Sequence, residues 1–341
     1  MTKKSILVTG GAGFIGSHTV VALAEAGFRP VIIDDFSNSR QSVLEGLRQI
    51  LGANVPCYVR DCNDRAALLE IVQHEQIEGV IHFAAFKAVG ESMQEPLRYY
   101  RNNLGSTLTL LEVMLEAGIS DLIFSSSCTV YGEPDALPVT ELTPVQPAIS
   151  VYGNTKQIGE EILRDTAAAG KPLKIISLRY FNPIGAHPSA QIGELPLGVP
   201  GNLVPYITQT AAGIRQQLTI FGDDYPTPDG TCIRDFIHVM DLAEAHVAAL
   251  RSLQQGSQGS RYDVFNIGTG QGNSVMELVR TFESVSGRAL NYRIGPRRAG
   301  DITAVYADAG KARLELGWTA RRSLREALED AWRWEQQIGK P

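Results

Sequence analysis

The stretch that decides the fold is Thr9-Gly10-Gly11-Ala12-Gly13-Phe14-Ile15-Gly16, near the beginning of this 341-residue chain. It follows an apolar run, Ser5–Thr9, and leads into Ile15–Ala26, where apolar residues recur at helical spacing. Its glycines have the spacing GxxGxxG, a variant of the fingerprint with which a strand–loop–helix unit binds a dinucleotide. We expect the first of these glycines to permit the tight turn and the second to let the backbone approach a pyrophosphate. The third would let helix and strand pack closely.

An acidic residue follows where such a unit needs one. Asp34 ends the next apolar run, Val31–Asp34, 18 residues after Gly16. A carboxylate at this place accepts hydrogen bonds from ribose hydroxyls and repels a 2′-phosphate, which favours NAD over NADP. Taken alone, Asp34 could be a solvated turn acid, because Asp35 and Asn38 follow it. Strand, loop, helix and acid together predict a bound NAD.

The first half of the sequence alternates short apolar runs, typical of buried strands, with segments of helical periodicity. This alternation predicts an α/β fold, a Rossmann-like doubly wound parallel sheet with ligands bound beyond the carboxyl ends of its strands. The expected helices include Ile15–Ala26, Ala66–His74 and Leu104–Glu116. The expected strands are Ser5–Thr9, Val31–Asp34, Val55–Val59, Gly79–Phe83, Leu122–Ser125 and Leu173–Leu178.

The character of the sequence changes after about residue 180, where prolines at positions 183, 188, 196, 200 and 205 interrupt the pattern. We expect residues 1–180 to form the NAD-binding domain. Residues 181–341 would form a smaller C-terminal α/β domain for the substrate, with the chain crossing back to the first domain around residues 238–267. The polar tract Gln254–Ser260 is expected to be a surface loop.

Composition excludes several classes of protein. The 31 basic and 37 acidic residues give a net charge of −6, which disfavours binding to nucleic acid or to an anionic membrane. No apolar run reaches the roughly 18 residues of a membrane helix. His238 and His246 fall on one helical pattern without a third ligand, and no metal is expected. The cysteines lack CxxC spacing and predict reduced thiols in a cytoplasmic protein: Cys57, Cys62, Cys128 and Cys232.

Tyr152 and Lys156 lie four residues apart at the start of a helical pattern, so the phenol and the ammonium share one helix face. Positive charge near a phenol favours the phenolate, which suits Tyr152 as a general base for a sugar hydroxyl. A Y-x-x-x-K pattern alone is more often an ordinary surface pair. The catalytic interpretation is favoured by Ser125-Ser126-Ser127-Cys128, which ends the fifth expected strand and brings hydroxyls to the ligand edge of the sheet.

These motifs, TGGAGFIG, SSSCTVYG and YGNTK, resemble the extended short-chain dehydrogenase/reductase family. Further segments narrow the resemblance, from one end of the chain to the other, to the UDP-glucose 4-epimerases within that family. They are FAAFKAVGES (Phe83–Ser92), RYFNPIGAHP (Arg179–Pro188), NLVPYI (Asn202–Ile207), IFGDDYPTPDGT (Ile220–Thr231) and RDFIHVMDLA (Arg234–Ala243).

The resemblance implies roles for individual residues. Tyr152 would be the base, Lys156 would hold the nicotinamide ribose, and Ser127 would contact the 4′-hydroxyl of the sugar. Besides Tyr152 and Lys156, the NAD site would comprise Gly10, Gly13, Phe14, Ile15, Gly16, Asp34, Asn38, Ser39, Asp61, Cys62, Phe83, Ala84, Lys87, Asn102 and Tyr180. The UDP-sugar site would comprise Ser127, Tyr152, Asn182, Asn202, Leu203, Phe221, Arg234, Arg298, Asp301 and Val305. The family also implies a homodimer.

The implied reaction is the interconversion of UDP-glucose and UDP-galactose by hydride transfer from sugar C4 to NAD, rotation of the 4-keto sugar and return of the hydride. Sugar-nucleotide dehydratases of this family carry an acidic pair after the serine, where this chain has Cys128 and Thr129, so elimination is disfavoured. Three alternatives stay open: a nucleotide-sugar dehydratase, a dehydrogenase that releases NADH, and a non-catalytic NAD-binding regulator.

Val305 departs from the family pattern, because many relatives restricted to glucose and galactose carry tyrosine there. The smaller side chain would leave room beside C2 of the sugar, and UDP-GlcNAc and UDP-GalNAc would then also be substrates. The alternative is that Val305 is a packing residue whose neighbours fill the space.

Overall fold

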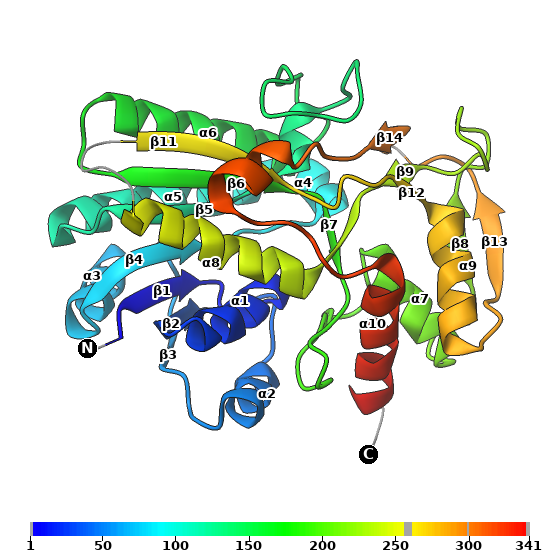
Figure 1. Cartoon of the computed structure of the whole chain (residues 1–341), viewed down its shortest axis with the longest axis horizontal. Helices are drawn as coiled ribbons and strands as arrows, with labels where there is room; N and C mark the ends of the chain where they lie inside the picture. Colours follow the sequence, from blue (N-terminus) through cyan, green and yellow to red (C-terminus); the bar gives the residue numbers. More distant parts are fainter. Residues whose placement is uncertain (1–2, 256–260, 299, 339–341) are drawn as a thin grey trace.

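Within residues 3–255, 261–298 and 300–338, which the computed structural model describes, seven parallel strands form one central sheet (Figure 1). Their order across the sheet is β11-β6-β5-β4-β1-β2-β3. The predicted Rossmann-like doubly wound sheet is therefore confirmed. The strand bounds are β1 Ser5–Thr9, β2 Arg29–Asp34, β3 Cys57–Val59, β4 Ile77–His82, β5 Asp121–Ser127, β6 Lys174–Tyr180 and β11 Arg261–Ile267.

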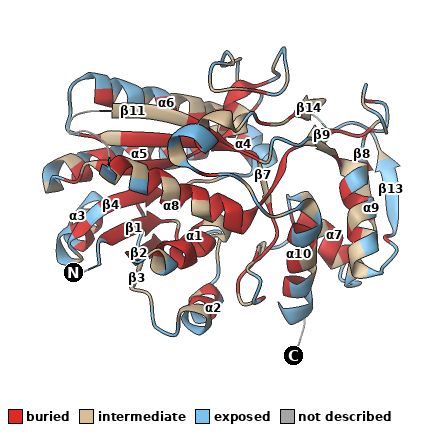
Figure 2. Cartoon of the chain, viewed as in Figure 1, coloured by how far each residue is buried: buried red, intermediate tan, exposed pale blue. Residues whose placement is uncertain are grey.

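Helices cover both faces of the sheet because successive residues of each buried strand point to opposite sides. In β1, Ile6 and Val8 join the apolar cluster beneath helices α1 and α8, whereas Leu7 joins the cluster beneath α3, α5 and α6. Figure 2 shows buried residues along the strands and the inward faces of these helices. The bounds are α1 Phe14–Glu25, α2 Ser42–Leu51, α3 Arg65–His74, α4 Val89–Gln94, α5 Pro96–Ala117, α6 Val151–Ala168 and α8 Val239–Gln255.

Local signals explain several helix ends. Asp64 caps α3, because its carboxylate accepts the Ala67 N–H at 3.1 Å. Pro96 is the first residue of α5, where its missing N–H costs nothing, and Gly118 ends that helix in the left-handed conformation.

Short strands and helices after residue 180 pack beside this sheet. Helices α7, α9 and α10 share an apolar cluster with the strands β8 and β10. The division into an NAD-binding and a substrate-binding domain stays a prediction. Helix α8 packs on the central sheet, and β11 is one of its strands. The remaining bounds are β7 Asn182–Ile184, α7 Leu203–Ala211, β8 Leu218–Phe221, β9 Ile233–Arg234, β10 Phe236–His238, β12 Asn273–Ser274, α9 Val275–Ser286, β13 Tyr292–Gly295, β14 Ala304–Val305 and α10 Leu324–Ile338, with single-turn helices at Cys128–Tyr131 (η1) and Ala312–Leu316 (η2).

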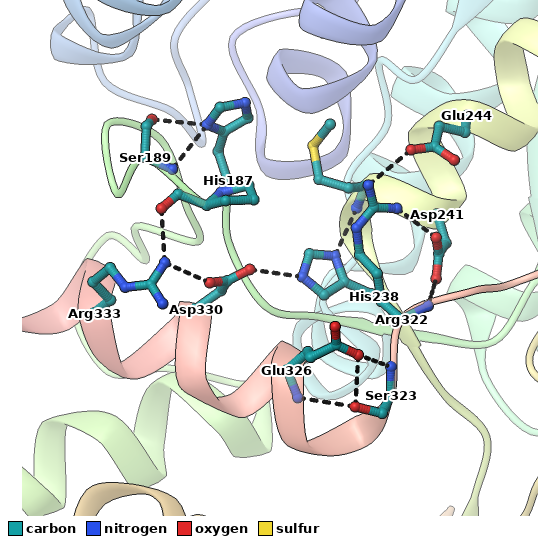
Figure 3. A network of polar contacts seen from close by, with 12 residues as sticks. His187, Ser189, His238, Asp241, Glu244, Arg322, Ser323, Glu326, Asp330 and Arg333 are labelled. Carbon is teal, nitrogen blue, oxygen red and sulfur yellow. Dashed lines mark hydrogen bonds and ion pairs between the residues drawn. The ribbon is translucent and has the colours of Figure 1, made fainter.

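A network of polar contacts fastens α10 to the beginning of α8 (Figure 3). The fully buried carboxylate of Asp241 accepts the Arg322 guanidinium at 2.5 Å and the Arg321 and Arg322 N–H groups at 3.0 and 2.9 Å. His238 Nδ1 accepts the Met240 N–H, so its Nε2–H donates to Asp330 of α10 at 3.2 Å. These contacts join the C-terminal helix to an element that lies on the central sheet.

Two details of the sequence expectations are corrected here. His238 and His246 do not share a helix: His238 ends β10, and α8 begins at Val239, because the buried His238 side chain bonds the first turn of that helix. Gln254 and Gln255, expected in a surface loop, are the last two residues of α8. The rest of that polar tract, residues 256–260, lies outside the described residues.

Candidate active site

The glycine loop between β1 and α1 has the close contacts that its sequence predicts. Gly10 has a φ of +67°, a conformation open mainly to glycine, and its N–H donates to the Ile33 carbonyl at 2.8 Å. A Cβ atom at Gly16 would lie 2.3 Å from the Gly10 carbonyl oxygen. Gly13 is the N-cap residue before α1 and makes no side-chain cap, so the first N–H groups of that helix point at this loop. Such an N-terminus favours an anion, which fits the pyrophosphate of NAD.

Asp34 links this loop to the end of β2. Its carboxylate accepts the Ala12 N–H, the Phe36 N–H and the Ser39 hydroxyl, each at 2.9 Å. Burial raises the pKa of Asp34, and these hydrogen bonds oppose that rise. Asn38 lies exposed in the same turn. The arrangement holds a carboxylate where the ribose of the expected NAD would lie.

The other predicted NAD residues lie near the carboxyl ends of β3 and β4. Asp61 and the buried Cys62 follow β3. Phe83 and Ala84 follow β4, and their N–H groups donate to the Thr9 carbonyl and hydroxyl at 3.0 and 3.3 Å. Two further predicted residues are Lys87 in the next loop and Asn102 on α5.

The predicted catalytic residues come together between β5 and α6. Ser150 caps α6 by accepting the Gly153 N–H at 3.0 Å, which sets the first turn that carries Tyr152. The buried Lys156 donates from Nζ to the Ser125 carbonyl at 2.6 Å, and Nζ lies 5.9 Å from the centre of the Tyr152 ring. Ser127 is the last residue of β5 and is buried.

The electrostatics of this group are dominated by burial. Burial raises the pKa of the Tyr152 phenol, and a hydrogen bond with Ser127 opposes that rise. Burial lowers the pKa of Lys156 to about 8, with Glu160 opposing. A bound nicotinamide cation would add positive charge and favour the phenolate further. Tyr180, at the end of β6, hydrogen-bonds through its hydroxyl to that of Ser125.

Part of the predicted UDP-sugar set also converges. Asp301 accepts Arg298 at 2.9 Å and lies 3.8 Å from the Arg234 guanidinium, and the Arg298 guanidinium stands 5.5 Å from the centre of the Phe221 ring. Val305 of β14 pairs in register with Arg234 of β9. Two guanidinium groups held in this way can bind a diphosphate. Asn182 lies on β7, next to the strand that follows Arg234.

Asn202 and Leu203 lie at the start of α7 and are tied to a residue that sequence reasoning missed. Oε1 of Glu194 accepts the Asn202 side-chain amide at 2.5 Å and lies 3.7 Å from Lys87 Nζ. Glu194 therefore connects a predicted NAD residue with a predicted UDP residue. Nothing in the sequence singles it out, because Lys87 is far away along the chain and the segment from Glu194 to Asn202, eight positions later, has no helical or strand pattern.

Asp235 was also missed. Its fully buried carboxylate accepts the Thr269 N–H and hydroxyl, at 2.9 and 2.6 Å, and the N–H groups of Gly270 and Ala307, at 3.1 and 3.2 Å. It thus holds together β9, the loop after β11 and the segment after β14. These hydrogen bonds of Asp235 also fix the position of the adjacent Arg234. The sequence shows only that an Asp follows an Arg, and it does not show these contacts.

Val305 is 4% exposed and belongs to an apolar cluster with Val130, Tyr131, Val139, Phe181 and Ala307. Packing is thus one of its roles, as the alternative interpretation expected. Room for an acetamido group beside this cluster stays a prediction.

No group of three or more His, Cys, Asp or Glu side chains suited to a metal ion occurs among the described residues. Their helices likewise include none that is long and apolar enough to cross a membrane.

Comparisons with known proteins agree with this geometry. The family described as NAD dependent epimerase/dehydratase matches residues 6–268. The chain belongs to that family. A UDP-glucose 4-epimerase of Neisseria meningitidis serogroup B is 50% identical over 331 residues, covering 97% of each chain.

Solved structures of related epimerases match the fold of nearly the whole chain. A UDP-glucose 4-epimerase from Bifidobacterium longum in complex with NAD+ and UDP superposes with a TM-score of 0.94, at 45% identity over 98% of both chains. A UDP-Glc/GlcNAc 4-epimerase from Campylobacter jejuni has a TM-score of 0.83, at 38% identity over 98% of each chain. The predicted resemblance is confirmed, and so is the prediction of an NAD-dependent epimerase, an isomerase. The roles of the individual site residues stay predictions.

Proposed function

We propose that this chain interconverts UDP-glucose and UDP-galactose by inverting C4 of the hexose. The observation that carries the proposal is the convergence of Ser127, Tyr152 and Lys156 at the ligand edge of the sheet, beside a glycine loop suited to NAD. Matches to UDP-glucose 4-epimerases over nearly the whole chain support the same substrate.

Each of the three residues has a distinct part in this reaction. Tyr152 takes the proton of the 4-hydroxyl and later returns it, while the Lys156 ammonium stabilises the phenolate. The Ser127 hydroxyl hydrogen-bonds the reacting oxygen. A bound NAD would supply the reversible hydride acceptor that inversion at C4 requires.

The site has to bind the diphosphate of the substrate firmly and still let the 4-keto sugar rotate. We assign the diphosphate to Arg234 and Arg298, whose guanidinium groups meet at Asp301. We assign the uridine end to Asn202, Leu203 and Phe221. In this proposal residues 1–180 hold NAD, residues 181–341 bind the UDP-sugar, and Ser127 and Tyr152 of the first part contact the reacting hydroxyl.

The environment of Cys128 disfavours the alternative that the protein is a dehydratase. Burial raises the pKa of its thiol to about 12, so the thiol stays protonated at neutral pH and does not serve as a base. Elimination of water needs both an acid and a base beside the sugar, and this position supplies neither.

The test is product analysis with purified protein and UDP-glucose, in wild type and Tyr152→Phe. We expect UDP-galactose from the wild type, no steady accumulation of NADH, and a rate about 100- to 10,000-fold lower in the variant. Accumulating NADH would indicate a dehydrogenase, and a 4-keto-6-deoxy product would indicate a dehydratase. Absence of any turnover, with NAD bound, would indicate a regulator.

We further propose that UDP-GlcNAc and UDP-GalNAc are interconverted as well. The support is the small side chain at Val305, together with the likeness to the UDP-Glc/GlcNAc epimerase from Campylobacter jejuni. Val305→Tyr should reduce turnover of UDP-GlcNAc far more than that of UDP-glucose, because a ring beside C2 obstructs one acetamido group. Val305→Ile is the matched control and should retain both activities. Wild type that turns over UDP-glucose alone would refute this extension.

A homodimer in the cytoplasm completes the proposal. The four cysteines are free in the structure, which suits a reducing compartment. Light scattering on the purified protein tests the dimer, since a monomeric mass at micromolar concentration would contradict it. Cell fractionation tests the compartment.

A further inference from the structure

Glu160 is a buried acid on the catalytic helix that the proposed reaction does not use. It lies on α6 one turn after Lys156 and two turns after Tyr152, so the three side chains share one face of the helix. It is 6% exposed. Oε1 accepts the Ser126 hydroxyl at 2.5 Å, and the Arg179 guanidinium donates to both oxygens, with Nη2 at 2.5 Å from Oε2.

These partners sit on neighbouring strands at one level of the sheet. Ser126 of β5 pairs in register with Arg179 of β6, and Arg179 also donates to the Tyr131 hydroxyl at 3.1 Å. A single carboxylate thus binds α6 to both strands. Ser126 stands between Ser125, whose carbonyl accepts Lys156, and the predicted catalytic Ser127. The position of α6 along β5 therefore decides what Lys156 and Tyr152 can reach.

The carboxylate also belongs to a residue one helical turn from the buried Lys156. Near neutral pH several titratable groups around Tyr152 and Lys156 are uncharged: burial lowers the pKa of His82 on β4 to about 3 and raises the pKa of Tyr180 on β6 and of Cys128 to about 12. Burial also raises the pKa of Tyr99 on α5 and of Tyr262 on β11. Glu91 of α4 is engaged by Arg98 and by the Tyr99 hydroxyl. Glu160, which is paired with the Arg179 cation, is the negative charge that favours the charged form of Lys156.

We propose that Glu160 is a positioning residue for this reaction: it fixes the helix that carries Tyr152 and Lys156 against β5 and β6, and it places a carboxylate one helical turn from the buried Lys156. The proposal rests on the proposed function for the roles of Tyr152 and Lys156. The titration of Lys156, however, can be measured whether or not the protein epimerises UDP-glucose, so the two can fail separately.

The test is a pH titration of the NAD-loaded protein, labelled with ¹³Cε-lysine and followed by NMR, with the Lys156 signal assigned by its loss in Lys156→Met. Glu160→Gln should lower the pKa of Lys156 by about one unit or more, because it removes an opposite charge near a buried ammonium. The alkaline limb of the epimerase pH profile should move to lower pH by the same amount.

Arg179→Gln is the matched control, because it breaks the same ion pair and leaves the negative charge in place. Its Lys156 pKa should stay at the wild-type value or rise, and Glu160→Asp should likewise keep the charge effect. If Glu160→Gln does not fold, the double variant E160Q/R179Q removes both charges together, a replacement that buried ion pairs often tolerate. Its Lys156 pKa should lie below that of Arg179→Gln. Equal Lys156 pKa values in Glu160→Gln and Arg179→Gln, or in the double variant and Arg179→Gln, would overturn the proposal.

Discussion

Replacing Gly16 by alanine tests the idea that the close backbone packing of the glycine loop holds NAD. A Cβ atom there would lie 2.3 Å from the Gly10 carbonyl oxygen and 2.8 Å from the Gly11 Cα atom. Both are backbone atoms, so neither can swing aside as a flexible side chain would. The φ of Gly16 is not in the left-handed region, and the cost is therefore one of contact rather than of backbone strain.

The expected size of the effect follows from that contact. To reach an ordinary separation, α1 and the loop have to move apart by roughly 1 Å, and insertion of a methyl group into close packing costs about 1–3 kcal/mol. The same movement displaces the N–H groups at the start of α1, and a hydrogen bond to a charged group contributes about 1.5–3 kcal/mol. A loss of about 2–3 kcal/mol in NAD binding corresponds to roughly 30- to 150-fold weaker affinity.

The measurement is the NAD content of the purified protein after denaturation, together with NAD affinity and thermal stability. Gly90→Ala is the matched control, because Gly90 lies in α4 and a Cβ atom there would meet none of the described residues within 4 Å, apart from its chain neighbours and the backbone of its own helix. We expect Gly90→Ala to retain NAD and to gain up to about 1 kcal/mol of stability, as a helical glycine replaced by alanine does. If Gly16→Ala binds NAD with wild-type affinity, the close packing of the glycine loop is not what holds NAD, because α1 would have moved without weakening NAD binding.

Three further predictions concern stability. Burial lowers the pKa values of His18, His82 and His246 to about 3, 3 and 4. The unfolding free energy should therefore fall as the pH drops below about 6.5, by up to about 1.4 kcal/mol per pH unit for each of these histidines, because the unfolded chain takes up protons that the folded chain excludes. Urea titrations at pH 7 and pH 5 measure this loss. Asp241→Ala and Arg322→Met should each lower the unfolding free energy by about 3 kcal/mol or more, because the first removes the acceptor of the Arg321 and Arg322 N–H groups and the second leaves the fully buried Asp241 carboxylate without its guanidinium; a loss below about 1 kcal/mol for either variant in urea titrations would contradict this. Ser150→Ala should cost about 1 kcal/mol by removing the cap of α6, whereas Ser150→Asp should retain most of the stability, and a loss as large in the aspartate variant would argue against a capping role.

Much of the fold could be predicted because its signals are local. The run Ser5–Thr9 is buried at every position and apolar at its three central ones, as in a two-sided parallel strand, and the glycines after it allow one particular turn. Tyr152 and Lys156 are one helical turn apart, so their proximity follows from helix geometry alone. In each case a few consecutive residues carry the whole signal.

The substrate side could not be derived in that way. Arg234 and Asp301 meet because strands of two residues, β9 and β14, pair in register, and strands so short leave no periodic pattern in the sequence. Glu194 reaches Lys87 across a long stretch of chain, and Asn202, eight positions away, across a segment that has no regular secondary structure. Resemblance to relatives could indicate Asn202 and Arg298, but it could not show that an acid already engages each of them.

That difference between the two sides follows from what the proposed reaction demands. The loop expected to hold NAD is built from backbone packed at contact distance, with Asp34 bonded to the loop and to the turn after β2, so little can move when the cofactor binds. Arg234 and Arg298, in contrast, are side chains that share Asp301. The Asp301 carboxylate keeps the two guanidinium groups aligned before the substrate binds. A diphosphate has to compete with this carboxylate for them, so the net binding free energy is smaller. A cofactor retained through the cycle suits the rigid site, and a nucleotide sugar that has to leave after each turnover suits the exchangeable one.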